Sequence, residues 1–138
     1  MKNLKVVKTI LLISGLVSVL IGSGILFAPF DFFGVNDIVL SNDSSLLNEI
    51  RSLGGMLLAS GMLIMLGAFI PKLTFTSILV SILLYFAYVG SRIFSIVVDG
   101  IPSQGLLVSL AVELLLGCLG LFALVQYRNN EEAQAVMS

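Results

Sequence analysis

Residues 73–98 read LTFTSILVSILLYFAYVGSRIFSIVV, an apolar segment that contains a single charged residue, Arg92. A helix needs roughly 20 mostly apolar residues to cross a hydrocarbon core of about 30 Å, so this segment is long enough to span a membrane. Its polar residues recur at steps of three or four, which places them on one helical face. These residues are Ser81, Tyr85, Tyr88, Arg92, Ser95 and, just after the segment, Asp99. A polar face of a membrane helix points away from lipid, so the pattern predicts a bundle with a polar interior.

Three further apolar segments lie on either side of this one, at about residues 6–28, 50–70 and 105–127. The chain is 58% hydrophobic and only 11% charged, which is far from the composition of soluble proteins. We therefore predict an all-α, integral membrane four-helix bundle that forms a single domain over residues 1–138. Its connections are short, apart from an external interfacial segment at 30–48 that carries aromatic anchors at Phe30, Phe32 and Phe33.

Proline and cap residues predict where the spans end. Pro29 and Pro71 are expected to close the first and second spans, and a capped helix start is expected near Ser44 or Ser45. The turn at Pro71 and Lys72 is so short that the second and third spans are expected to be antiparallel neighbours.

The distribution of charge predicts the orientation of the chain. Lys2, Lys5 and Lys8 precede the first span, Lys72 separates the second from the third, and Arg128 follows the fourth. The alternate connections are acidic and contain no lysine. The positive-inside rule therefore predicts a multi-pass protein of the cell membrane with both termini in the cytoplasm. The first apolar stretch is longer than the core of a signal peptide, so it is expected to be a retained span.

Cysteine and histidine usage excludes several classes of redox and metal protein. The chain has one cysteine, Cys118, and no histidine. Dithiol exchange, haem or di-iron ligation by histidine and the usual zinc sites all lack their residues, so no metal and no cofactor is expected. Cys118 is expected to be a small core residue of the fourth span. Membrane lipids are the expected partners, and no nucleic acid is expected.

Small residues recur along each span where helices can approach closely. The pattern is consistent with packing inside one chain or with a homo-oligomer formed through these faces. The residues are Ser14, Ser18 and Gly22, then Gly55 and Ala59, then Ala87, Ser91 and Ser95, then Gly117 and Gly120.

Three lone charges lie within the apolar segments: Arg51, Arg92 and Glu113. At 1.5 Å per residue, Arg92 lies about 10 Å and Glu113 about 12 Å from the external ends of their antiparallel spans. We therefore expect the two side chains to form a pair, since either charge alone in the membrane is costly. Arg51 comes from the same side of the membrane, together with Glu49 and Asp99.

Three interpretations of these charges stay open. They form a structural ion-pair network, or they line an external polar pocket together with Tyr85 and Tyr88. In the third interpretation, Arg51 and Glu49 only contact lipid head groups.

The same positions carry a resemblance to a known family. Glu49-Ile50-Arg51 with Gly54-Gly55, Arg92 with Ser95, Asp99-Gly100 with Pro102, and Glu113 with Gly117 resemble the pattern of an uncharacterised bacterial family of small four-span membrane proteins, a domain of unknown function. The layout is more distantly similar to the DoxX-like four-helix group. The resemblance implies the fold and these residues, and it names no reaction.

Two functions from different classes follow from the sequence. The first is binding or transport of a small amphipathic or anionic molecule, such as a lipid or a quinone-like compound, by Arg51, Arg92, Glu113, Tyr85, Tyr88, Glu49 and Asp99. The second is a structural or accessory membrane subunit whose charges serve folding and assembly. An enzyme is less expected, because the sequence offers no recognisable nucleophile, metal site or phosphate loop.

Overall fold

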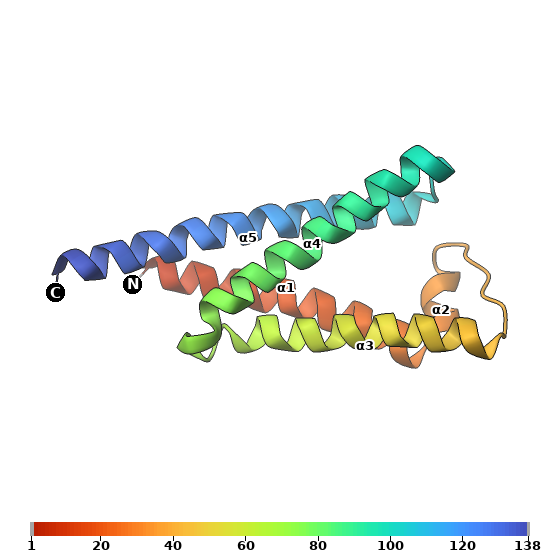
Figure 1. The fold of residues 1–138 in the computed structure, drawn as a ribbon, viewed down its shortest axis with the longest axis horizontal. Helices are drawn as coiled ribbons and strands as arrows, with labels where there is room; N and C mark the ends of the chain where they lie inside the picture. The colour runs from red at the N-terminus through yellow and green to blue at the C-terminus, as the bar shows by residue number, and fades with distance from the viewer. Residues whose placement is uncertain (1, 138) are drawn as a thin grey trace.

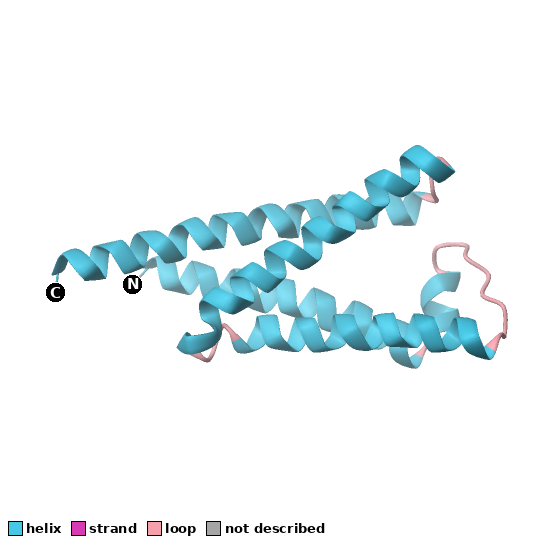
Figure 2. Ribbon diagram, viewed as in Figure 1, coloured by secondary structure: helices cyan, strands magenta, loops and turns pink. Residues whose placement is uncertain are grey.

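The computed structural model describes residues 2–137, which form five helices and no strand (Figure 1; Figure 2). The helices are α1 (Lys2–Phe27), α2 (Pro29–Gly34), α3 (Ser44–Leu66), α4 (Pro71–Asp99) and α5 (Gln104–Met137). Among the described residues, α1, α3, α4 and α5 are long and apolar enough to cross a membrane. The predicted all-α bundle of a multi-pass membrane protein is confirmed.

The helix boundaries follow local chemistry, and they correct the role predicted for Pro71. Helix α1 ends at Phe27, just before Pro29, as predicted. Pro29 begins α2 and Pro71 begins α4, where the missing N–H of proline is not needed, but α3 ends at Leu66, before Pro71 is reached. The chain instead turns between α3 and α4 at residues 67–70. Helix α3 begins at Ser44, as predicted, because the Asp43 carboxylate accepts a hydrogen bond from the Leu46 N–H at 2.8 Å.

Two of the helices differ clearly from the predicted spans, α3 in position and α5 in length. Helix α3 starts at Ser44 and ends at Leu66, whereas the predicted span covered 50–70. Helix α5 continues to Met137, beyond the apolar segment and through Arg128 and Glu131. Hydropathy marks the part of a helix that fits in lipid, but polar residues of good helix propensity extend the helix further.

Helices α1 and α3 form the most intimate antiparallel pair, in which the backbones touch at glycines. A Cβ built on Gly61 would lie 2.7 Å from the Val19 nitrogen and 2.8 Å from the Gly15 carbonyl oxygen. Gly22 and Gly54 make a second such contact, and the Ser18 hydroxyl between them donates to the Leu57 carbonyl at 2.9 Å. This is the close approach by which small residues hold membrane helices together.

The helix face that the sequence predicted for packing of the second span, at Gly55 and Ala59, was wrong by one position. Nothing lies within 4 Å of a Cβ on Gly55, and Ala59 is exposed. The contact with α1 uses Gly54 and Gly61 instead. Ser14, Ser18 and Gly22 are buried as predicted for packing inside the chain, and Gly117 and Gly120 lie against α4. The predicted face at Ala87, Ser91 and Ser95 is exposed.

Helices α4 and α5 form a second pair, and the two pairs diverge along the molecule (Figure 1). We call the end with the α1–α3 and α4–α5 connections the loop end, and the end with both termini and the α3–α4 turn the terminal end. The main buried core lies at the terminal end, around Val7, Leu11, Ile64, Ile78 and Ala123. Although α3 and α4 are antiparallel neighbours in the chain, they separate toward the loop end (Figure 1).

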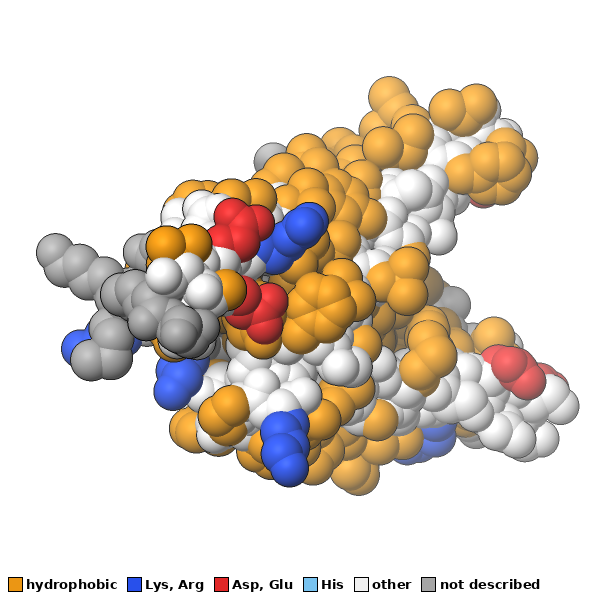
Figure 3. Space-filling view, turned by 60° about the vertical axis from the view of Figure 1, so that its left-hand side comes forward, with side chains coloured by type: hydrophobic (Ala, Val, Ile, Leu, Met, Phe, Trp, Pro, Cys, Tyr) orange, Lys and Arg blue, Asp and Glu red, His pale blue; other side chains and the backbone are white. Residues whose placement is uncertain are grey.

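The outer surface has the composition expected of a membrane protein. Large hydrophobic side chains such as Phe27, Leu83 and Phe94 are exposed along the helices. Hydrophobic side chains cover much of the face in Figure 3. Figure 3 also shows the notch between the diverging helix pairs. An apolar exterior of this extent is suited to lipid and not to water.

Candidate functional site

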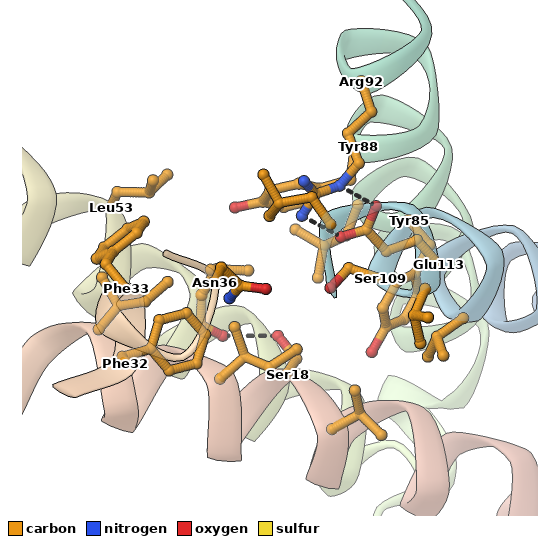
Figure 4. Close-up of a pocket in the computed structure, with 18 of the residues that line it drawn as sticks. Ser18, Phe32, Phe33, Asn36, Leu53, Tyr85, Tyr88, Arg92, Ser109 and Glu113 are labelled. Atoms are coloured by element: carbon orange, nitrogen blue, oxygen red, sulfur yellow. Dashed lines mark hydrogen bonds and ion pairs between the residues drawn. The ribbon is translucent and has the colours of Figure 1, made fainter. Parts of the chain in front are cut away.

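A cavity of about 470 Å³ lies at the loop end, where the two helix pairs separate (Figure 4). Helices α1, α3, α4 and α5 provide mostly apolar walls, and residues 32–38 cover it. The apolar lining is Val17, Ile21, Ile25, Phe32, Phe33, Ile38, Leu53, Leu57, Leu84, Leu106, Val108 and Val112. The polar lining is Ser18, Asn36, Tyr85, Tyr88, Arg92, Ser109 and Glu113.

Arg92 and Glu113 meet at this cavity, as the sequence predicted. Arg92 Nε donates to Glu113 Oε2 at 2.6 Å, and Nη2 donates to Oε1 at 2.9 Å. The side chains are 27% and 10% exposed. A bidentate pair of this kind is strong and fixes the orientation of both groups. Gly117, one turn beyond Glu113, allows the Phe86 ring to pack on α5 and so brings the two helices together.

The two tyrosines of α4 also face the interior. The Tyr88 ring lies with its centroid 6.0 Å from Arg92 Cζ, and its hydroxyl is buried without a hydrogen-bond partner in the described chain. Tyr85 is buried, and its hydroxyl donates to the carbonyl of Ser14. Ser81 completes the buried part of the predicted polar face, whereas Ser95 and Asp99 are exposed and bonded to each other.

The structure does not place Arg51, Glu49 or Asp99 on the cavity. Arg51 is exposed and donates from Nη1 to the carbonyl of Leu26, in the last turn of α1. It lines a separate shallow depression with residues of α3, and Glu49 is exposed nearby. Carbonyls at a helix C-terminus lack intrahelical partners and attract cations, which gives Arg51 a partner that sequence spacing does not reveal.

Several lining residues were not predicted as site residues. Phe32 and Phe33 are half-buried over the cavity, although the sequence suggested that they anchor the chain at the interface. Phe32 packs on Gly24, and the Asn36 amide lies against Gly105 at the start of α5. In the sequence, the signal for these contacts was the glycines at positions 24 and 105. A glycine leaves room for a larger side chain but does not identify which one will fill it.

Cys118 is exposed on α5, so its predicted place in the core was wrong. Gly117 and Gly120 of the same helix lie against α4, and Cys118 faces away from them. A single apolar helix gives little information about which side is buried, because lipid and core accept the same side chains.

Comparison with known proteins supplies a family and no activity. No curated protein and no solved structure matches the chain significantly. Residues 6–124, which include α2, α3 and α4, most of α1 and α5, and the Arg92–Glu113 pair, match one family of unknown function over most of the chain. The chain therefore belongs to the family described as "Domain of unknown function (DUF4345)".

Proposed function

We propose that this membrane protein binds, and in one form of the proposal transports, a small amphipathic molecule in the loop-end cavity. The observation that carries the proposal is the cavity itself, because about 470 Å³ is within the usual range of small-molecule sites. Its apolar walls suit an alkyl chain or ring system. Its polar group, formed by Arg92, Glu113, Tyr88 and Ser109, suits a head group, as in a lipid or a quinone-like compound.

A structural role is the second candidate, and one observation favours it. The Arg92–Glu113 pair is complete without a guest, because the carboxylate is engaged by two guanidinium donors. Such a pair can fix the register of α4 and α5 in an accessory subunit. The two candidates differ in whether the cavity is occupied.

Filling the cavity tests the first candidate. Val112 lines the cavity and is 41% exposed, whereas Leu115 of the same helix is 59% exposed and does not line it. We expect Val112→Trp to reduce the amount of co-purifying amphiphile measured by native mass spectrometry, and Leu115→Trp to leave it unchanged. Equal amounts in both variants would favour the structural candidate.

The orientation and location of the protein belong to the same proposal. With both termini in the cytoplasm of a bacterial cell, the loop end and its cavity face outward. The exposed lysines Lys5, Lys8 and Lys72 at the terminal end support this orientation. The distant similarity to the DoxX-like four-helix group is part of the same proposal. Single cysteines at Val39 and Lys72, in a Cys118→Ala background, test it. An impermeant thiol reagent applied to intact cells should modify position 39 and not position 72.

A further inference from the structure

The charge of the cavity is balanced before any guest enters. Arg92 and Glu113 are the only Asp, Glu, Lys or Arg among its described lining residues, and they neutralise each other. The remaining polar groups of the lining are hydroxyls and the Asn36 amide. A guest therefore meets a site of no net charge, although that site contains an arginine.

Beside the ion pair, Arg92 and Tyr88 keep free hydrogen-bond donors. Glu113 accepts from the Nε–H and from one N–H of Nη2, which leaves three of the five guanidinium N–H groups, two of them on Nη1. The Tyr88 hydroxyl is buried and has no partner in the described chain. Tyr88 and Arg92 are neighbours on the inner face of α4, with the guanidinium over the ring, so both donors lie on one side of the cavity (Figure 4). An acceptor atom placed there would satisfy a polar group that is otherwise buried unpaired, which is a costly state.

A carbonyl group and an anion differ in what they require of this site. A carbonyl oxygen needs one or two donors and brings no charge. An anionic head group needs a net positive charge to offset its desolvation, but the charge of Arg92 is already compensated by Glu113. The same anion would also be repelled by the Glu113 carboxylate.

We propose that the cavity selects uncharged amphiphiles whose polar end is a carbonyl-type acceptor, such as an ester, ketone or quinone, and that Glu113 excludes anions of the same size. This inference rests on the proposed binding function and narrows its guest to one chemical class. Arg92 and Tyr88 are the contacts of the acceptor, and Glu113 is the residue that determines selectivity.

Two photoreactive probes with the same alkyl chain test the selection. One ends in a methyl ester and the other in a permanently ionised sulfonate, and both carry a diazirine on the chain. The full-length protein is labelled in phosphatidylcholine nanodiscs, and labelled peptides are quantified by mass spectrometry. Labelling of cavity residues is divided by labelling around Leu83, which is exposed on the outer face, so that differences in membrane partitioning cancel.

We expect the ester to exceed the sulfonate by at least about tenfold in this ratio, because an uncompensated buried charge costs more than one tenfold step of affinity. A sulfonate that labels the cavity as well as the ester overturns the selection and leaves the cavity as a binding site. If neither probe labels the cavity above the outer face, the proposed function fails and the inference fails with it.

Two variants separate the residues involved. Glu113→Gln leaves Arg92 positively charged, so the preference should shift toward the sulfonate, and an unchanged ester preference contradicts the role of Glu113. Tyr88→Phe keeps the ring and the ion pair, so it tests the acceptor contact even if Glu113→Gln does not fold. It should lower ester labelling several-fold, whereas Tyr127→Phe, at the terminal end, should not. Equal labelling in these two variants overturns the Tyr88 contact.

Discussion

At the scale of residues, the pairing of Arg92 with Glu113 could be predicted, and the position of Arg51 could not. The first follows from helix geometry, because two charges at the same depth on antiparallel helices have few other partners. Arg51 instead bonds to the carbonyl of Leu26. Every helix end offers such carbonyls, so a sequence cannot indicate which one an arginine will use.

We expect substitutions at the two residues of the ion pair to lower stability by different amounts. Arg92→Met leaves the nearly buried Glu113 carboxylate without its partner, and we expect a loss of about 3–5 kcal/mol of stability. Glu113→Leu should cost less, because Arg92 is more exposed and its long side chain can reach a polar region. The double variant should recover much of the larger loss. Unfolding in mixed micelles measures the stability of the wild type, the two single variants and the double variant. If the double variant loses as much stability as the two single variants together, the residues are not coupled.

We expect substitution of Arg51 to affect the protein differently from substitution of the ion pair. The sequence suggested a ligand contact, for which Arg51→Gln would weaken lipid binding and leave stability unchanged. Its bond to the end of α1 favours the reverse, with a loss of about 1 kcal/mol and unchanged labelling of the cavity. Arg51→Lys keeps the positive charge beside the helix terminus and should lose less. Reduced cavity labelling in Arg51→Gln at full stability would restore the role suggested by the sequence.

At the scale of elements, the number and order of the long apolar helices could be predicted because hydropathy and length determine them, whereas the short α2 was not predicted. Which face of each helix is buried was harder to predict. Gly54 and Gly55 are adjacent and chemically equal, but only Gly54 lies against α1. The seven-residue spacing shared by Gly15–Gly22 and Gly54–Gly61 was the informative pattern, since two antiparallel helices with this spacing can touch at both positions.

These glycines supply a matched pair of substitutions. Gly61→Ala places a Cβ 2.7 Å from the Val19 nitrogen, where backbone must move, and we expect a loss of about 1–3 kcal/mol. Gly55→Ala, six positions earlier on the same helix, meets nothing within 4 Å and should be neutral or stabilising by up to about 1 kcal/mol. Thermal unfolding in detergent compares the two. Equal effects would mean that α1 and α3 do not touch at Gly61.

At the scale of the whole molecule, the splay of the bundle is what creates the cavity, and no local pattern predicts it. The sequence indicates that α3 and α4 are joined by a tight turn, which holds only at the terminal end. Ser77 bonds to the Leu63 carbonyl and Thr74 to the Gly67 carbonyl there, each at 2.8 Å. Beyond this contact α4 follows α5, and the opening that results is covered by the segment after α1.

The segment that covers the cavity, residues 32–38, contacts α5 through Asn36, and a cross-link at this contact can test how a guest enters. A Cβ on Gly105 would lie 3.3 Å from Asn36 Cγ, so cysteines at both positions are close enough for a disulfide. In a Cys118→Ala background, we expect oxidation of Asn36→Cys/Gly105→Cys to lower photolabelling of the cavity, and reduction to restore it. Each single cysteine variant, oxidised in the same way, controls for the substitutions themselves. If the cross-link forms by mass and labelling is unchanged, the guest does not enter beneath residues 32–38, and the diverging sides of α3 and α4 become the route from lipid to the cavity.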